Sequence, residues 1–262
     1  MTKEELIKIS KGLYRNIESN IHQVVDLYDS QNEIDNFYYG LISRQLMLIT
    51  DMSCLLSNQY LKNFTGLFIL GRSIIDDFMP LHYSITSQSP KDEIVKFNAL
   101  GHKNVFKKLD ELADLNERIL DANFPYYPTK ETVKNLKDKF SENNSNDKYF
   151  TDKSNFKLKN ALNKRQLIDT YKGKDSEADL FRAYYRWRQF SDYVHYSKYS
   201  YNFIIQNQTI LNQYDDIAEI FAYGYYGSKL IMKYFESEYN VEHIKFDRYE
   251  NVTIQYFSHI NK

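Results

Sequence analysis

The chain has 262 residues, a formal net charge of −1 and a single cysteine, Cys54. This length is enough for one large domain with a sizeable core. A nearly neutral chain does not attract nucleic acid as a whole, so a polyanion site would have to be a local patch. One cysteine excludes an intramolecular disulfide and a zinc site made of thiolates alone, as is typical of a reducing compartment. The N-terminus does not resemble a signal peptide and no apolar run could span a membrane, so we expect a cytoplasmic protein without membrane contact.

The spacing of apolar residues predicts helices along most of the chain. Gly and Pro occur only 8 and 4 times, which favours long helices and few loops. Pro80 is expected to kink or end its helix, and Cys54 is expected to pack in the core. We predict an all-α fold with helices over about 3–28, 30–56, 59–85, 90–119, 130–140, 155–171, 177–199 and 215–239.

These helices are expected to form a single domain, residues 1–262. Its core bundle would comprise about 30–122 and 175–240, with a basic helical insertion, a long hairpin, over about 125–174. Residues 130–174 hold 12 Lys or Arg against 6 Asp or Glu. Two interpretations stay open: the excess charge is a solvated helical surface, or it guides the phosphates of RNA or DNA.

The segment from Tyr184 reads Y-Y-R-W-R-Q-F-S-D-Y-V-H-Y-S. Arg188 and His195 are seven residues apart, so on one helix they would leave the same face about two turns apart. Asp192 lies between them, and Ser191 lies one turn before His195.

An Arg and a His in this arrangement suit the cleavage of RNA. A neutral imidazole takes a proton from a ribose 2′-hydroxyl at a pH close to its own pKa. A guanidinium holds the phosphate with two hydrogen bonds and offsets the charge of the transition state. The products would be a 2′,3′-cyclic phosphate and a 5′-hydroxyl, and the reaction needs no metal or other cofactor. The alternative is an ion-pair ladder of Arg188, Asp192 and His195 along a helix surface.

The motif R-x4-6-H late in an all-α domain resembles that of the HEPN superfamily, and here it runs from Arg188 to His195. A second likeness is the segment Gly71-Arg72-Ser73-Ile74-Ile75-Asp76-Asp77. It is similar to the R-S-x-x-E segment of an uncharacterised HEPN-like group, in which a Y-x-x-x-S-x-x-x-H helix follows. That pattern appears here as Trp187, Ser191 and His195. The resemblance covers roughly residues 58–239.

This resemblance implies a HEPN-like helical bundle. Many bacterial members are metal-independent endoribonucleases of toxin–antitoxin and phage-defence systems, and they are usually homodimers. The implied partners are single-stranded RNA, a second copy of the chain, and an antitoxin or another protein of a defence system. Arg188 and His195 would be the catalytic residues.

Arg72 and Asp76 lie four residues apart on an otherwise apolar helix. A buried charge is costly unless it is paired, so the two side chains could satisfy each other. Alternatively, Asp76 orients the imidazole of His195 and Arg72 adds a phosphate contact, with Ser191 and Asp192 as further supporting residues. We expect the two motif helices to pack together.

Other candidates are weaker. His82 and His102 flank Pro90 and could meet, but no further His or carboxylate at the spacing of metal ligands accompanies them. Three aromatic residues of the motif helix could stack on bases or could pack in the core, namely Tyr184, Trp187 and Tyr193.

Two functions therefore compete. The first is a metal-independent endoribonuclease. The second is a catalytically inactive HEPN-like module that binds a nucleotide or a partner protein. A small-molecule enzyme is a third possibility, with no motif in its favour.

Overall fold

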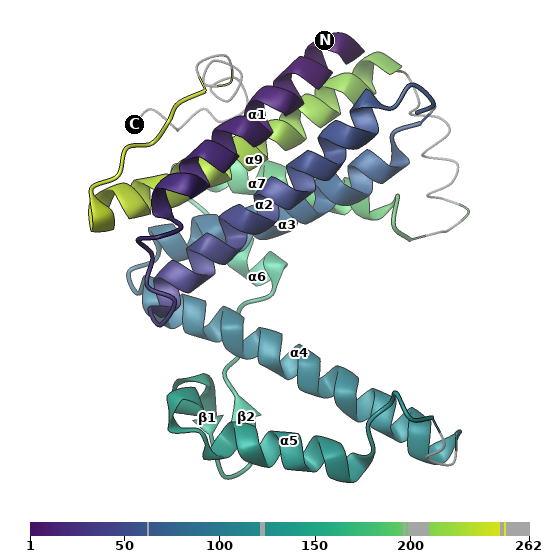
Figure 1. Cartoon of the computed structure of the whole chain (residues 1–262), viewed down its shortest axis with the longest axis vertical. Helices are drawn as coiled ribbons and strands as arrows, with labels where there is room; N and C mark the ends of the chain where they lie inside the picture. Colours follow the sequence, from purple (N-terminus) through teal and green to yellow (C-terminus); the bar gives the residue numbers. More distant parts are fainter. Residues whose placement is uncertain (62, 121–123, 196–197, 199–209, 247–248, 250–262) are drawn as a thin grey trace. The chain divides into compact units, whose positions relative to one another are not determined.

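The computed structural model describes residues 1–61, 63–120, 124–195, 198, 210–246 and 249 (Figure 1). Helices dominate this part of the chain, which confirms the predicted all-α class. The chain divides into two compact units: the first contains residues 1–86 and 163–262, and the second contains residues 87–162. The predicted division differs, because the helix that begins at Pro90 was assigned to the core bundle and belongs to the second unit.

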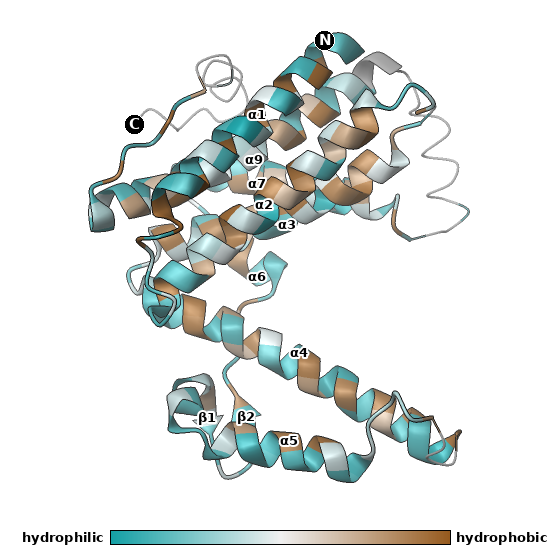
Figure 2. Cartoon of the chain, viewed as in Figure 1, coloured by the Kyte–Doolittle hydropathy of each residue, from teal (hydrophilic) through white to brown (hydrophobic). Residues whose placement is uncertain are grey.

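The first unit is a helical bundle. Its helices are α1 (Lys3–Val24), α2 (Glu33–Ser57), α3 (Thr65–Thr86), α6 (Lys164–Asp169), α7 (Glu177–Ser191) and α9 (Ile210–Tyr239). Helix α9 packs against α1, α2 and α3, and α3 also packs against α7. In Figure 2, apolar and polar residues alternate along these helices, as expected for amphipathic elements with one buried side.

Close packing of α3 on α9 fixes the core of this unit. A Cβ atom at Gly71 would lie 2.4 Å from Cδ1 of Ile220, so only glycine fits there without a shift. Phe78, Phe221 and Phe235 are fully buried in the same bundle. The segment that carries Arg72 is therefore held firmly against the rest of the bundle.

The second unit combines helices with a small hairpin. It contains α4 (Pro90–Arg118), α5 (Lys130–Glu142), a 3-10 helix η1 (Asn144–Tyr149), and the antiparallel strands β1 (Phe150–Asp152) and β2 (Lys157–Leu158). Its core is made of Val95, Ala99, Tyr149, Phe150 and Leu158, with Phe140 and Phe156 packed against it.

Several local predictions were wrong. The helix expected over about 155–171 is replaced by β2 and the short α6. Pro80 lies inside α3 and does not end it: the helix continues to Thr86, because the neighbours Met79 and Leu81 are buried and their packing outweighs the proline penalty. Cys54 is exposed rather than packed in the core. Among the described residues, no helix is long and apolar enough to cross a membrane.

Candidate functional site at the end of α7

Helix α7 ends earlier than the motif spacing implied. It stops at Ser191, and the next three residues form turns in which Tyr193 N donates to Phe190 O at 3.2 Å and Val194 N donates to Ser191 O at 3.0 Å. These shorter-range bonds tighten the end of the helix. His195 thus lies just beyond α7, and the prediction that one regular helix presents both Arg188 and His195 on the same face is wrong.

Both motif residues are nevertheless on the surface. Arg188 and His195 are exposed, whereas Ser191 and Asp192 between them are half-buried. Within the part of the chain that the structure describes, Arg188 forms no ion pair with Asp192 or with another carboxylate. The alternative of an ion-pair ladder along the helix is therefore wrong for this arginine, and its guanidinium remains available to an anion.

Arg72 joins the two sequence motifs. Its Nε donates a 2.9 Å hydrogen bond to Oγ of Ser191, and Ser191 in turn donates to the carbonyl oxygen of Trp187 at 2.8 Å. The guanidinium carbon of Arg72 lies 4.9 Å from the centroid of the Trp187 ring. The expected packing of the two motif helices is confirmed. Arg72 is held by one side of its guanidinium, which leaves the terminal amino groups for another ligand.

Asp76 has a different partner from either one predicted. It forms an ion pair with Lys164 of α6, with 2.8 Å between Oδ1 and Nζ. Lys164 Nζ also lies 5.0 Å from the centroid of the Trp187 ring. Asp76 therefore binds neither Arg72 nor His195, and instead anchors α6 against α3. Two cations, Arg72 and Lys164, contact the same indole ring.

The middle of α7 is joined to α9 by ion pairs of buried and half-buried side chains. Arg182 Nε lies 2.6 Å from Oε1 of Glu219, and Arg186 lies 2.7 Å from Glu219 and 2.9 Å from Asp216. Burial raises the pKa of the Glu219 carboxyl, but the hydrogen bonds and charges of the two arginines outweigh it and hold this pKa below its usual value. These carboxylates are thus already neutralised, and they do little to offset the charges of Arg72 and Arg188.

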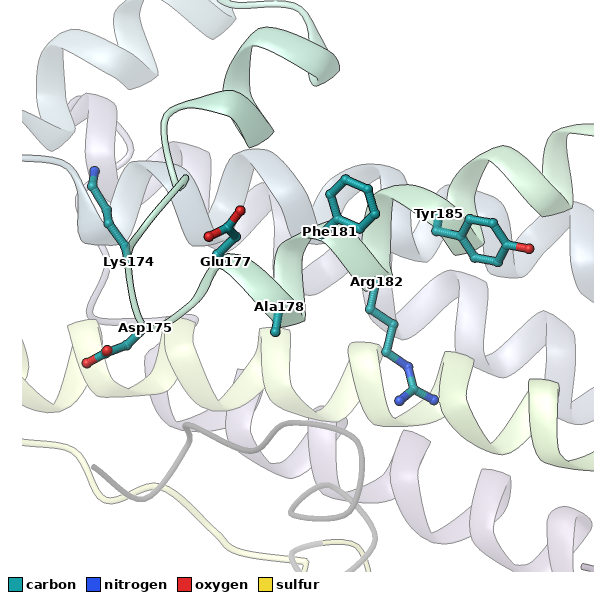
Figure 3. Close-up of a pocket in the computed structure, with 7 residues that line it drawn as sticks. All are labelled: Lys174, Asp175, Glu177, Ala178, Phe181, Arg182 and Tyr185. Carbon is teal, nitrogen blue, oxygen red and sulfur yellow. The ribbon is translucent and has the colours of Figure 1, made fainter.

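A pocket of about 840 Å³ opens over the first turns of α7 (Figure 3). Figure 3 shows Arg182 extending toward α9, where it binds Glu219. The side chains of Phe181 and Tyr185 also line the pocket, and they are 50% and 62% exposed. Arg188 follows Tyr185 by three residues and so continues the same side of the helix. These two aromatic residues were not predicted as part of the site, because their helical spacing did not distinguish them from core positions.

The aromatic residues that we did single out have structural roles. Tyr193 packs on Phe68, with 4.7 Å between ring centroids, and Tyr184 stacks on Trp187 at 6.0 Å. His82 is buried, and burial lowers the pKa of its imidazole to about 4. His102 packs between Phe140 and Tyr149 in the second unit. Within the described ranges, no three His, Cys, Asp or Glu side chains lie close enough together to hold a metal ion.

Comparisons of the chain with protein-family models, with curated proteins and with solved structures find no match. The class of protein is therefore defined by its own helices: it is an all-α protein in which α3 and α7 pack together.

Proposed function

We propose that this protein is a metal-independent endoribonuclease that acts on single-stranded RNA. The observation that carries the proposal is the hydrogen bond between Arg72 and Ser191. It links Arg72 of α3 to Ser191 at the end of α7, in the segment of the chain that also carries the exposed Arg188 and His195. Two guanidinium groups without carboxylate partners in the described part of the chain, together with the imidazole of His195, are the groups that cleavage of a phosphodiester requires.

In the proposed reaction, the imidazole of His195 accepts the proton of a ribose 2′-hydroxyl. The 2′-oxygen then attacks the adjacent phosphorus, and the bond from phosphorus to the 5′-oxygen breaks. The leaving oxygen takes up a proton from water. Arg188, assisted by Arg72, binds the non-bridging oxygens as their negative charge increases. The exposed rings of Phe181 and Tyr185 provide stacking surfaces for unpaired bases upstream.

In this proposal, the protein acts in the cytoplasm as a homodimer, within a bacterial defence or toxin–antitoxin system. An exposed site at the end of a helix favours an arrangement in which a second copy helps to enclose the RNA. Light scattering during size-exclusion chromatography tests this part directly, since a mass of one chain at working concentration contradicts it.

A second function is a catalytically inactive module that binds RNA, a nucleotide or a partner protein. One observation favours it: α7 ends at Ser191, so the regular helix does not set the spacing between Arg188 and His195. In this case Arg188 would still bind phosphate, but His195 would not need to reach the 2′-hydroxyl.

Cleavage of labelled single-stranded RNA in EDTA separates the two functions. We expect the wild type to cut, and His195→Ala to lose at least about a hundredfold in rate, as for a general base. His22→Ala, which alters an exposed histidine of α1, is the matched control and should cut normally. Unchanged cleavage by His195→Ala contradicts the nuclease proposal. A wild type that binds RNA without cutting it, and binds less tightly as Arg188→Ala, supports the second function.

A further inference from the structure

The second unit contains a pocket that the proposed function does not use. It has a volume of about 660 Å³, and all of its lining residues lie between 100 and 160. One wall is a single face of α4, formed by Leu100, Lys103, Asn104 and Lys107, which recur at helical spacing. The other walls come from Lys137 of α5 and from the β1–β2 hairpin. This volume is in the range of pockets that bind small molecules.

Positive charge dominates the lining. Four lysines and one carboxylate, that of Asp110, face the pocket. Lys137 binds both oxygens of Asp110, at 2.8 and 2.7 Å, so that carboxylate is already neutralised. Lys103 donates at 2.9 Å to the uncharged Asn160, and Lys157 forms no ion pair within the described residues. Lys107 forms an exposed ion pair with Glu111 at 3.7 Å, which solvent screens. The pocket therefore has cations to offer a ligand with several negative charges.

Aromatic rings form the apolar part of the pocket. Phe106 is buried, and Phe156 meets it edge to face with 5.0 Å between ring centroids. Phe156 adopts a φ of 51°, which a bulky residue rarely does. Its ring also packs against Phe140 and Phe150, and Nζ of Lys137 lies 5.7 Å from its centroid. The hairpin thus holds an aromatic side chain at the pocket despite an unfavourable backbone conformation.

We propose that this pocket binds a nucleoside phosphate. The phosphates would contact Lys103, Lys157 and Lys107, and the base would lie against Phe156. Asn104 lines the same wall, and its side-chain amide has no hydrogen-bond partner among the described residues, so this amide can both donate to and accept from a base edge. A pocket of this volume suits one nucleotide better than a continuous RNA strand. The inference concerns the second unit and does not depend on the ribonuclease proposal.

Isothermal titration calorimetry of the full chain with ATP, GTP, CTP and UTP tests the proposal. We expect at least one of the four to bind, and the double variant Lys103→Ala/Lys157→Ala to weaken its affinity by about tenfold or more, the effect of losing charge-assisted hydrogen bonds. Lys139→Ala is the matched control, because it removes an exposed lysine of α5 that does not line the pocket. Asn104→Ala should alter the preference among the four bases while leaving the affinity for tripolyphosphate unchanged.

Three results would overturn the proposal. In the first, none of the four nucleotides binds, or the double variant binds as tightly as the wild type. In the second, tripolyphosphate binds as tightly as the best nucleotide, which would make the site one for an anion alone. In the third, a 20-residue single-stranded RNA binds through these lysines while the nucleotides do not. Circular dichroism of each variant confirms that a loss of binding does not come from unfolding.

Discussion

Helix α7 carries arginines in two different environments. Arg182 and Arg186, in its middle turns, are bound to carboxylates of α9, and Glu219 is only 2% exposed. Arg188, less than one turn later, is exposed and forms no ion pair in the described part of the chain. The difference teaches that charge pairing, rather than residue type or position in a motif, separates an arginine that holds the fold from one that is available to a ligand.

The largest expected effect comes from breaking the buried pairs. Arg186→Ala leaves Asp216 and part of Glu219 without a cation in a buried site, so we expect the free energy of unfolding to fall by about 3 kcal/mol. Arg188→Ala removes an exposed, unpaired side chain and should change it by less than about 0.5 kcal/mol. Urea unfolding of the two variants measures both values. Equal losses would show that the two environments are not energetically distinct.

A second prediction compares two buried carboxylates. Burial raises the pKa of Asp77 from 3.8 to about 6; the charge of Arg44 opposes this, and that of Asp76 adds to it. The pKa of Asp77 is higher in the folded state than in the unfolded state. Protonated Asp77 therefore contributes fully to the free energy of unfolding at low pH, and this contribution is lost as the pH rises from about 4 through 6. Asp77 has one cation partner, 3.0 Å away, whereas Glu219 has two.

Denaturant unfolding of wild type and Asp77→Asn at pH 4, 5, 6 and 7 measures this contribution. Relative to the variant, the wild type should lose up to about 3 kcal/mol of unfolding free energy over this range. Parallel pH profiles would contradict the raised pKa and would place Asp77 with Glu219 among the fully compensated carboxylates.

A smaller effect is expected at the junction of the two motifs. Arg72→Lys keeps the charge but loses the planar group that bonds to Ser191 and stacks on Trp187. Combined with Ser191→Ala in a double-mutant cycle, it should give a coupling energy of about 1 kcal/mol. A coupling near zero would mean that this hydrogen bond does not hold α3 against α7.

The smallest effect is expected at exposed ion pairs. Arg118 and Asp114 form such a pair on α4, with 3.4 Å between the charged atoms. Arg118→Ala should change the free energy of unfolding by less than about 0.5 kcal/mol, and raising the salt concentration should abolish even that. A loss as large as that of Arg186→Ala would remove the distinction between surface pairs and the pairs that join α7 to α9.

The spacing of apolar residues predicted where most helices lie, but it did not predict the end of α7 or the β1–β2 hairpin. Helix α9 ends at Tyr239 as predicted, since its apolar repeat stops there. The end of α7 was missed because neither Gly nor Pro marks Ser191 and the helical pattern continues past it. The β1–β2 hairpin is too short for a strand period to appear, and its turn contains Phe156 where a glycine would have signalled it.

The candidate site was predicted in part. The meeting of the two motif helices followed from charged residues at positions where packing alone would favour apolar ones. The partner of Asp76 could not be predicted, because Lys164 lies on a short helix far along the chain and local spacing made Arg72 the nearest cation. Phe181 and Tyr185 were missed because the spacing of apolar residues identifies a face of a helix but does not show whether another element packs on that face.

Trp187 is the single tryptophan of the chain. Its indole lies against Arg72 and Lys164, at 4.9 and 5.0 Å from the ring centroid. The chain therefore contains its own optical reporter at the candidate site, since tryptophan emission responds to the charges around the ring. Any anion that draws either cation away from the indole should change the intrinsic fluorescence, so ligands for this site can be screened with unlabelled protein.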